Sequence, residues 1–128
     1  MFERYTESGR RAIFFARQES GRLGSQQIQC LHVLLGLLNE SGATFLGAGL
    51  RGTVQDLAGD LRRALPEARD PIPDHLDLPL SNECKNALHT AAAEAERLGS
   101  RHVQPVHLAL GLAEECQDLA TILSKPRS

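Results

Sequence analysis

Residues 22–37, RLGSQQIQCLHVLLGL, are repeated 75 positions later as RLGSRHVQPVHLALGL at residues 97–112. The likeness extends without a gap over residues 6–40 and 81–115, where 13 of 35 aligned positions are identical. Repetition at a fixed offset indicates a duplicated structural unit, whose copies pack on each other to bury a core. In the first copy, the identical positions are Ala12, Ala16, Glu19, Arg22, Leu23, Gly24, Ser25, Gln29, His32, Leu35, Gly36, Leu37 and Glu40.

At 128 residues, the chain has the length of one compact domain, which we expect to span residues 1–128. Its formal net charge is −2, with both signs mixed along the sequence. This pattern argues against a nucleic-acid partner, because a nucleic-acid surface needs a concentrated basic face. The sequence also predicts no membrane span, since it has no apolar window of about 18 residues, and its polar start is not a signal peptide.

The chain has three cysteines, Cys30, Cys84 and Cys116, an odd number without Cys-x-x-Cys spacing. Disulfides are rare in the reducing cytosol. The sequence therefore predicts reduced, mostly buried thiols and a cytoplasmic location.

The spacing of apolar residues predicts an all-α fold of about seven helices in two pseudo-symmetric repeats. Repeat one is expected over residues 1–65 and repeat two over residues 80–124, with an extended, exposed linker at residues 66–79. That linker contains four of the six prolines. In repeat one, we expect helices at residues 6–23, about 30–40, 43–48 and about 54–65. In repeat two, we expect helices at residues 81–98, about 105–115 and about 117–124, without the last helix of repeat one.

Residues that start, stop or interrupt helices recur in both copies. Thr6 and Ser81 are suitable N-caps, and a glycine follows the first helix of each copy. Gly36 and Gly111 lie inside helices, where glycine costs about 1 kcal/mol relative to alanine. Their recurrence predicts a close approach between helices that leaves no room for a side chain.

The sequence resembles the Clp N-terminal domain, the double helical repeat of bacterial Clp unfoldases. The start, Met-Phe-Glu-Arg-Tyr-Thr-Glu, is similar to the start of that family. A Glu-x-x-Arg-Leu-Gly element stands at residues 19–24 and 94–99, and a His-x-x-Leu-Gly-Leu element at residues 32–37 and 107–112. The resemblance covers about residues 1–124.

This resemblance implies a domain without catalytic residues or cofactors. In Clp unfoldases, the domain docks adaptor proteins and substrate segments for an ATPase ring. The chain has no Gly-x-x-x-x-Gly-Lys-Ser/Thr phosphate loop, so it cannot hydrolyse ATP by that mechanism. A Clp ATPase encoded elsewhere is one expected partner.

Two helix starts depart from the family's Gly-Thr-Glu-His pattern. They read Gln-Cys30-Leu31-His and Gln-Pro105-Val106-His. In the subgroup that reads phosphorylated arginine, the glutamates pair with the guanidinium, which leucine and valine cannot do. The resemblance thus implies weak or absent phosphoarginine binding. Leu31 and Val106 are either tolerated surface or half-buried residues, or two apolar docking spots.

His32 and His107 recur in register within this element. A metal site would need further ligands close by, and the sequence around them has no His-x-x-x-His motif and no cysteine-rich cluster. We therefore interpret both as structural histidines that tie helices together, and expect no metal.

The family likeness also implies a groove between the repeats, beside the N-terminal segment. An exposed aromatic ring next to cations there would suit a docked peptide. The alternative is that Phe2 and Phe14 seal the junction between the repeats. The residues expected to border the groove are Phe2, Arg10, Ile13, Phe14, Arg17, Leu80, Lys85 and His89.

The favoured function is that of a non-catalytic protein-binding module for adaptors or substrates in Clp-dependent proteolysis or quality control. One alternative is a small helical regulator that binds a ligand or DNA, and a less favoured one is an enzyme. The expected state is a monomer, or a homodimer that covers apolar residues near Leu119, Ile122 and Leu123.

Overall fold

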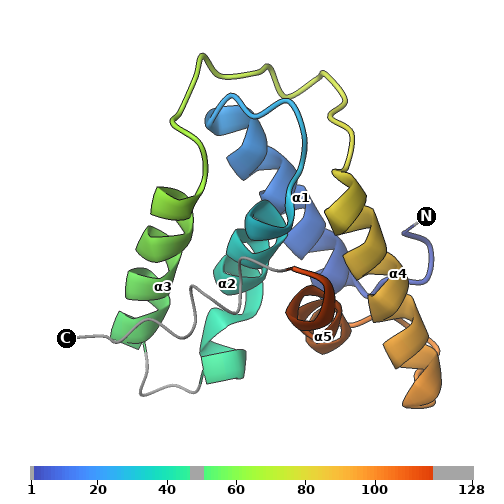
Figure 1. Ribbon diagram of the computed structural model, residues 1–128. Coiled ribbons are helices and arrows are strands. Elements are labelled where there is room, and N and C mark those ends of the chain that lie inside the picture. Colours follow the sequence, from blue (N-terminus) through green and yellow to red (C-terminus); the bar gives the residue numbers. More distant parts are fainter. Residues whose placement is uncertain (1, 47–50, 117–128) are drawn as a thin grey trace.

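The computed structural model describes the backbone of residues 2–46 and 51–116, and the side chains of residues 2–40 and 56–116. The regular elements in these residues are helices, as the sequence predicts (Figure 1). Among them, none combines the length and the apolar character that a membrane span needs. The helices are α1 (Glu7–Arg22), α2 (Cys30–Leu46), α3 (Arg51–Ala64), α4 (Asn82–Arg97) and α5 (Pro105–Glu115).

Helix α2 is longer than predicted. It continues through Gly42 to Leu46, so the break at that glycine and the separate helix from residue 43 are wrong. The physical reason is that one interior glycine costs only about 1 kcal/mol, which an established helix tolerates. The helix predicted at residues 117–124 and the apolar residues Leu119, Ile122 and Leu123 lie outside the described residues.

The predicted caps are confirmed at the start of both repeats. The Thr6 hydroxyl accepts a hydrogen bond from the Gly9 N–H, and the Ser81 hydroxyl accepts one from the Cys84 N–H, each at 3.1 Å. At the other ends of α1 and α4, Gly24 has φ of 69° and Gly99 has φ of 74°. These left-handed conformations favour glycine and end the helices.

The two repeats exchange short extended segments. Tyr5 forms a parallel bridge with Val103, and Leu80 forms one with Ile28. Leu80 and Val103 are the equivalents of Tyr5 and Ile28 at the 75-residue offset, so the second bridge is the first with the repeats interchanged. Each repeat therefore pairs its N-terminal segment with the inter-helix connection of the other, which gives a pseudo-two-fold arrangement.

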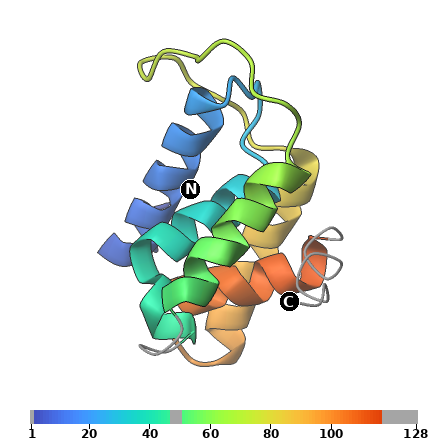
Figure 2. The same cartoon turned by 90° about the vertical axis from the view of Figure 1, so that its left-hand side faces the viewer.

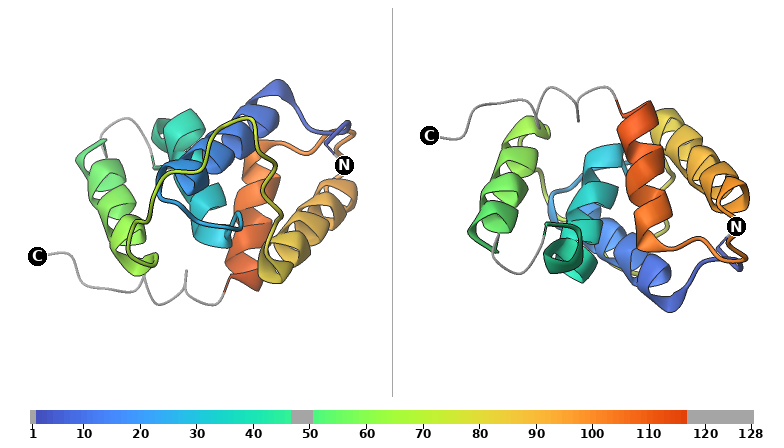
Figure 3. Two further views of the ribbon diagram at one scale, coloured as in Figure 1. Left: turned by 90° about the horizontal axis from the view of Figure 1, so that it is seen from above. Right: turned by 90° about the horizontal axis from the view of Figure 1, so that it is seen from below.

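Glycine allows the closest helix contacts within each repeat. A Cβ atom added at Gly36 of α2 would collide with the carbonyl oxygen of Ala12 in α1. One added at Gly111 of α5 would collide with that of Ala87 in α4. The predicted close approach is thus confirmed in both copies, and α2 and α5 lie side by side between α1 and α4 (Figure 3).

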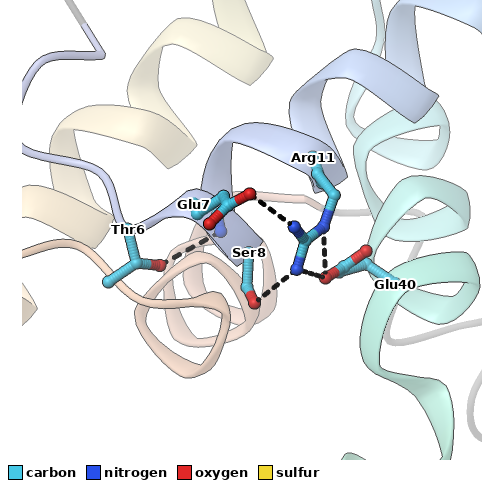
Figure 4. A network of polar contacts seen from close by, with 6 residues as sticks. Thr6, Glu7, Ser8, Arg11 and Glu40 are labelled. Atoms are coloured by element: carbon cyan, nitrogen blue, oxygen red, sulfur yellow. Dashed lines mark hydrogen bonds and ion pairs between the residues drawn. The ribbon is translucent and has the colours of Figure 1, made fainter.

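Polar contacts at the surface join α1 to α2. The Arg11 guanidinium lies 2.8 Å from the Glu40 carboxylate and 3.0 Å from that of Glu7, and it also donates to the Ser8 hydroxyl (Figure 4). Hydrogen bonding with Arg11 lowers the pKa of Glu40. The first turns of α1 are therefore tied to α2 at Glu40.

Helix α3 lies on the outer side of α2, away from α4 and α5 (Figure 3). Its inner face buries Leu57 and Leu61, and Leu65, directly after the helix, is also buried. Arg62 on the same helix lies 2.7 Å from Glu19 of α1. Among the described residues of repeat two, no helix occupies the corresponding place beside α5.

The segment at residues 66–79 passes over the ends of α1 and α2 (Figure 2). Most of its side chains are exposed, as predicted. Its backbone is nevertheless held, because the Arg69 N–H donates to the Leu23 carbonyl and the Ile72 N–H to the Gly21 carbonyl. The Arg17 side chain also donates to the carbonyls of Pro73 and Leu76.

Candidate functional site

His32 and His107 are buried, with 1% and 3% of their surfaces exposed. The Nδ1 atom of each accepts a hydrogen bond at 2.9 Å from the backbone N–H three residues earlier, at Gln29 and Gln104. The same interaction in both copies supports the structural interpretation. Burial lowers the pKa of His32 to about 4, which keeps its ring neutral at pH 7 and able to accept this bond.

The two altered helix starts have different environments. Cys30 and Leu31 are only 2% and 5% exposed, whereas Val106 is 45% exposed and Pro105 is half-buried. Leu31 is thus a core residue, and both its surface interpretation and the docking spot proposed for it are wrong. Val106 remains available as an apolar surface residue.

Helix α3 explains this difference between equivalent positions. Leu35 and Leu38, on the same stripe of α2 as Leu31, line a small pocket together with Ala58 and Arg62 of α3. On α5, the equivalent of Leu35 is Leu110, which is 36% exposed. The stripe that α3 covers in repeat one therefore stays open in the described part of repeat two.

One end of the predicted groove is formed by the N-terminal segment and α4. Lys85 and His89, which are exposed, line a pocket together with Arg4, Tyr5 and Leu88. The structure thus brings these two predicted residues together. The prediction missed Arg4 and Tyr5, whose only signal was their place in the family-like start of the chain.

Phe2 and Arg10 form the rim of this end. The Phe2 and Tyr5 rings meet edge to face with centroids 5.0 Å apart, and Phe2 packs partly on the core. The Arg10 side chain donates to the carbonyls of Phe2 and Glu3. Phe2 therefore helps to seal the junction, as the alternative interpretation had it, while Arg10 fixes the N-terminal segment on α1.

The other end of the predicted groove lies along α1. Arg10, Phe14 and Arg17 stand at i, i+4 and i+7 and share one face of this helix. Phe14 is 57% exposed, so it does not seal the repeat junction. Ile13, by contrast, is a core residue with 9% exposure, and its assignment to the groove is wrong, because its side chain is buried in the core rather than exposed to solvent.

Leu76 extends this surface. It is 46% exposed, and its carbonyl accepts a hydrogen bond from Arg17. Leu80 of the predicted groove is half-buried and packs against the core beside Ile28. We define the docking face as Phe14, Leu76, Arg10, Lys85 and His89. Leu76 was missed because it lies in a segment that the sequence identified only as a linker.

A second pocket, which sequence reasoning missed, lies beneath the linker. Gln26, Gln29 and His32 from the first inter-helix connection and α2 line it with Leu65 and Glu67. It exists in repeat one because α3 and the linker close it. The polar run before Cys30 was its only signal in the sequence.

The fold and this surface define a class: an all-helical double-repeat domain with exposed apolar and cationic side chains on α1 and α4. The family described as the Clp repeat (R) N-terminal domain matches residues 4–125. The chain belongs to this family, whose members are non-catalytic substrate- or adaptor-binding domains of Clp/Hsp100 ATPases.

The curated relatives support the same family assignment. The chain is 32% identical over 117 residues to the chloroplastic chaperone protein ClpD2 of Oryza sativa subsp. japonica, covering 88% of this chain and 12% of that protein. It is 31% identical over 126 residues to the ClpA homolog of Guillardia theta, covering 94% and 15%. The chain thus spans a small part of the length of these relatives.

Solved structures show the same fold. The N-terminal domain of ClpD from Arabidopsis thaliana aligns with a TM-score of 0.75 and 26% identity, over 96% of this chain and 84% of that one. The Hsp104 N-terminal domain from Candida albicans aligns with a TM-score of 0.77 and 20% identity, over 94% and 80%.

Proposed function

We propose that this chain is a cytoplasmic, non-catalytic module that docks adaptor or substrate proteins for Clp-dependent proteolysis or protein quality control. Family membership supports the general role, and the docking face supports a specific location for it. The observation that carries the location is Phe14, which is 57% exposed on a helix whose other apolar residues are buried or half-buried.

The chemistry of the docking face indicates the kind of segment it binds. Phe14 and Leu76 offer apolar contacts, which contribute most when a partner covers them fully. Arg10 and Lys85 add exposed positive charges to the docking face, and His89 adds an exposed imidazole. The fitting partner segment carries one or two large apolar residues flanked by carboxylates, whose charges speed association and set orientation.

A binding experiment tests this assignment. The probe is a fluorescently labelled, permanently unfolded protein rich in leucine, phenylalanine and aspartate, and binding is measured by fluorescence anisotropy. Phe14→Ala should weaken binding about tenfold or more, which corresponds to roughly 1.4 kcal/mol. Lys85→Glu should also weaken binding, and the loss of affinity should be larger at low salt than at high salt.

Leu98→Ala is the matched control, because Leu98 is also a large exposed apolar residue, at 53%, but lies at the end of α4 outside the docking face. It should leave binding unchanged. Equal binding by wild type and Phe14→Ala, or equal losses in the Phe14 and Leu98 variants, would contradict the proposed face.

We also propose that the module works as a monomer or a homodimer. The open stripe of Val106 and Leu110 on α5 is the described apolar surface that a second copy would cover. Size-exclusion chromatography with light scattering distinguishes the two states. A dimer that Leu110→Lys dissociates would identify this stripe as its interface.

A further inference from the structure

The three cysteines of the chain converge at one point of the fold. Cys30 is the first residue of α2, Cys84 lies in the first turn of α4, and Cys116 is the C-cap of α5. All three are buried, at 2%, 0% and 4% exposure, and none is in a disulfide. The Cys30 thiol lies close enough to the thiols of Cys84 and Cys116 for both to influence its pKa.

A carboxylate completes this group. Glu83, adjacent to Cys84 on α4, is exposed, and one of its oxygens lies with the sulfurs of Cys30 and Cys116 such that all three atoms are within 4.8 Å of one another. Three donors, from α2, α4 and the end of α5, thus lie close together, and Glu83 is the exposed one among them.

The duplication does not explain this convergence. Residues equivalent to Cys30 and Cys84 in the other repeat are Pro105 and Gly9, neither of which carries a ligand atom in its side chain. A buried cysteine by itself is an ordinary small apolar residue. Packing gives no reason for all three cysteines of the chain to meet, nor for a carboxylate to join two of them.

We propose that Cys30, Cys116 and Glu83 form a binding site for one Zn²⁺ ion, with a solvent molecule as the fourth donor. Zinc takes four ligands in a tetrahedron, at about 2.3 Å to sulfur and about 2.0–2.2 Å to carboxylate oxygen, so its donors stand roughly 3.5–4 Å apart. A separation of at most 4.8 Å needs only small side-chain movements to reach that arrangement. The mixed set of sulfur and oxygen favours zinc over copper(I), which prefers sulfur alone.

The ion would link the repeats. Cys30 comes from repeat one, while Glu83 and Cys116 come from repeat two. On binding, each ligating thiol releases its proton to solvent and the sulfur binds as thiolate. Because the ligands come together only in the folded chain, Zn²⁺ should raise the melting temperature, by roughly 5–10 °C near a hundredfold excess over its dissociation constant.

Cobalt(II) in place of zinc tests the ligands directly. In the reduced, full-length protein kept free of oxygen, one equivalent of Co²⁺ should produce an intense thiolate-to-cobalt charge-transfer band in the near ultraviolet, and Zn²⁺ should abolish it. The exposed His75, His89 and His102 can bind metal adventitiously, but they give no such band. Absence of the band would overturn the proposal.

Variants decide which residues hold the ion. Glu83→Gln should weaken Zn²⁺ binding about tenfold or more in calorimetry. Its matched control is Glu7→Gln, which removes an exposed carboxylate from the equivalent first turn of α1. Cys30→Ser should abolish the charge-transfer band.

Glu83 is exposed, so its replacement preserves the fold even if Cys30→Ser does not fold. The proposed zinc site would be overturned if Glu83→Gln left the zinc affinity unchanged, or if the Glu83 and Glu7 variants reduced it equally.

Discussion

Single residues decide where the helices can approach each other. The recurrence of Gly36 predicts a close helix contact. Only the tertiary structure shows that the atom opposite this glycine is the carbonyl oxygen of Ala12. Sequence periodicity says which face of a helix is buried and not which backbone atom lies opposite. The same holds for Gly111 and Ala87 in the second repeat.

Gly36→Ala should lower the free energy of unfolding by roughly 3 kcal/mol, because the added methyl group forces α1 and α2 apart. Gly59→Ala is the control within α3, where a Cβ meets only the end of the flexible Arg63 side chain. It should raise stability by about 0.5–1 kcal/mol through helix propensity. Urea unfolding measures both, and a Gly36 variant as stable as wild type would refute the close contact.

His32 should make stability depend on pH. Its folded-state pKa of about 4 lies below its ordinary value of 6.5, so the unfolded state binds more protons between these values. This contribution is complete above about pH 6.5 and is lost as the pH falls towards 4, by roughly 3 kcal/mol in all.

His32→Gln keeps an acceptor for the Gln29 N–H but cannot titrate, so its unfolding free energy should change less over this pH range. His75→Gln, which changes an exposed histidine, is the control and should behave as wild type. Parallel pH profiles for wild type and His32→Gln would show that His32 does not carry the effect.

At the scale of elements, α3 breaks the symmetry of the duplication. The repeated sequence predicts equal environments for Leu31 and Val106, yet α3 covers only the stripe that contains Leu31. The pairing of Arg62 with Glu19 holds α3 against α1. In repeat two, Glu94 is equivalent to Glu19 and lies 2.7 Å from Arg97.

Leu31→Ala should therefore cost about 2–5 kcal/mol of unfolding free energy, since it leaves a cavity between α2 and its neighbours. Val106→Ala, at the equivalent position of α5, should change it by less than about 0.5 kcal/mol. Denaturant unfolding of the two variants measures the difference. Equal costs would mean that α3 does not distinguish the repeats in solution.

At the scale of the whole molecule, the repeats form one unit because each completes the other. The Tyr5–Val103 and Ile28–Leu80 bridges join segments more than fifty residues apart. The duplication predicted that the halves would pack together, but periodicity could not reveal that extended segments are exchanged between them. The prolines of the linker likewise predicted exposure and not the hydrogen bonds that hold it.

The whole molecule should not bind phosphoarginine. The family positions that would supply anionic partners are Leu31, which is buried, and Val106, which is apolar. A guanidinium there would lose its hydration without gaining a carboxylate. Calorimetric titration with phosphoarginine should give no heat of binding up to millimolar ligand, and micromolar affinity would contradict this prediction.

The candidate site was only partly predictable. Exposed Phe14 follows from helical spacing, since it lies off the stripe of Ala12 and Ala16. Leu76 and Arg4 could not be assigned, because they reach the site through a linker and a terminal segment whose paths depend on tertiary contacts. Ile13 was misplaced, because the family likeness put it at the groove whereas the structure buries it in the core.

The sequence by itself determined most of the helices, the caps of α1 and α4, the duplication and the family, because these depend on local spacing and on motifs that are read along the chain. Only the tertiary structure decided which equivalent positions differ, since α3 covers one repeat and not the described part of the other. It also brought Cys30, Cys84 and Cys116 together. These residues have no chelating spacing in the sequence, and their proximity arises from the packing of three helices around one point.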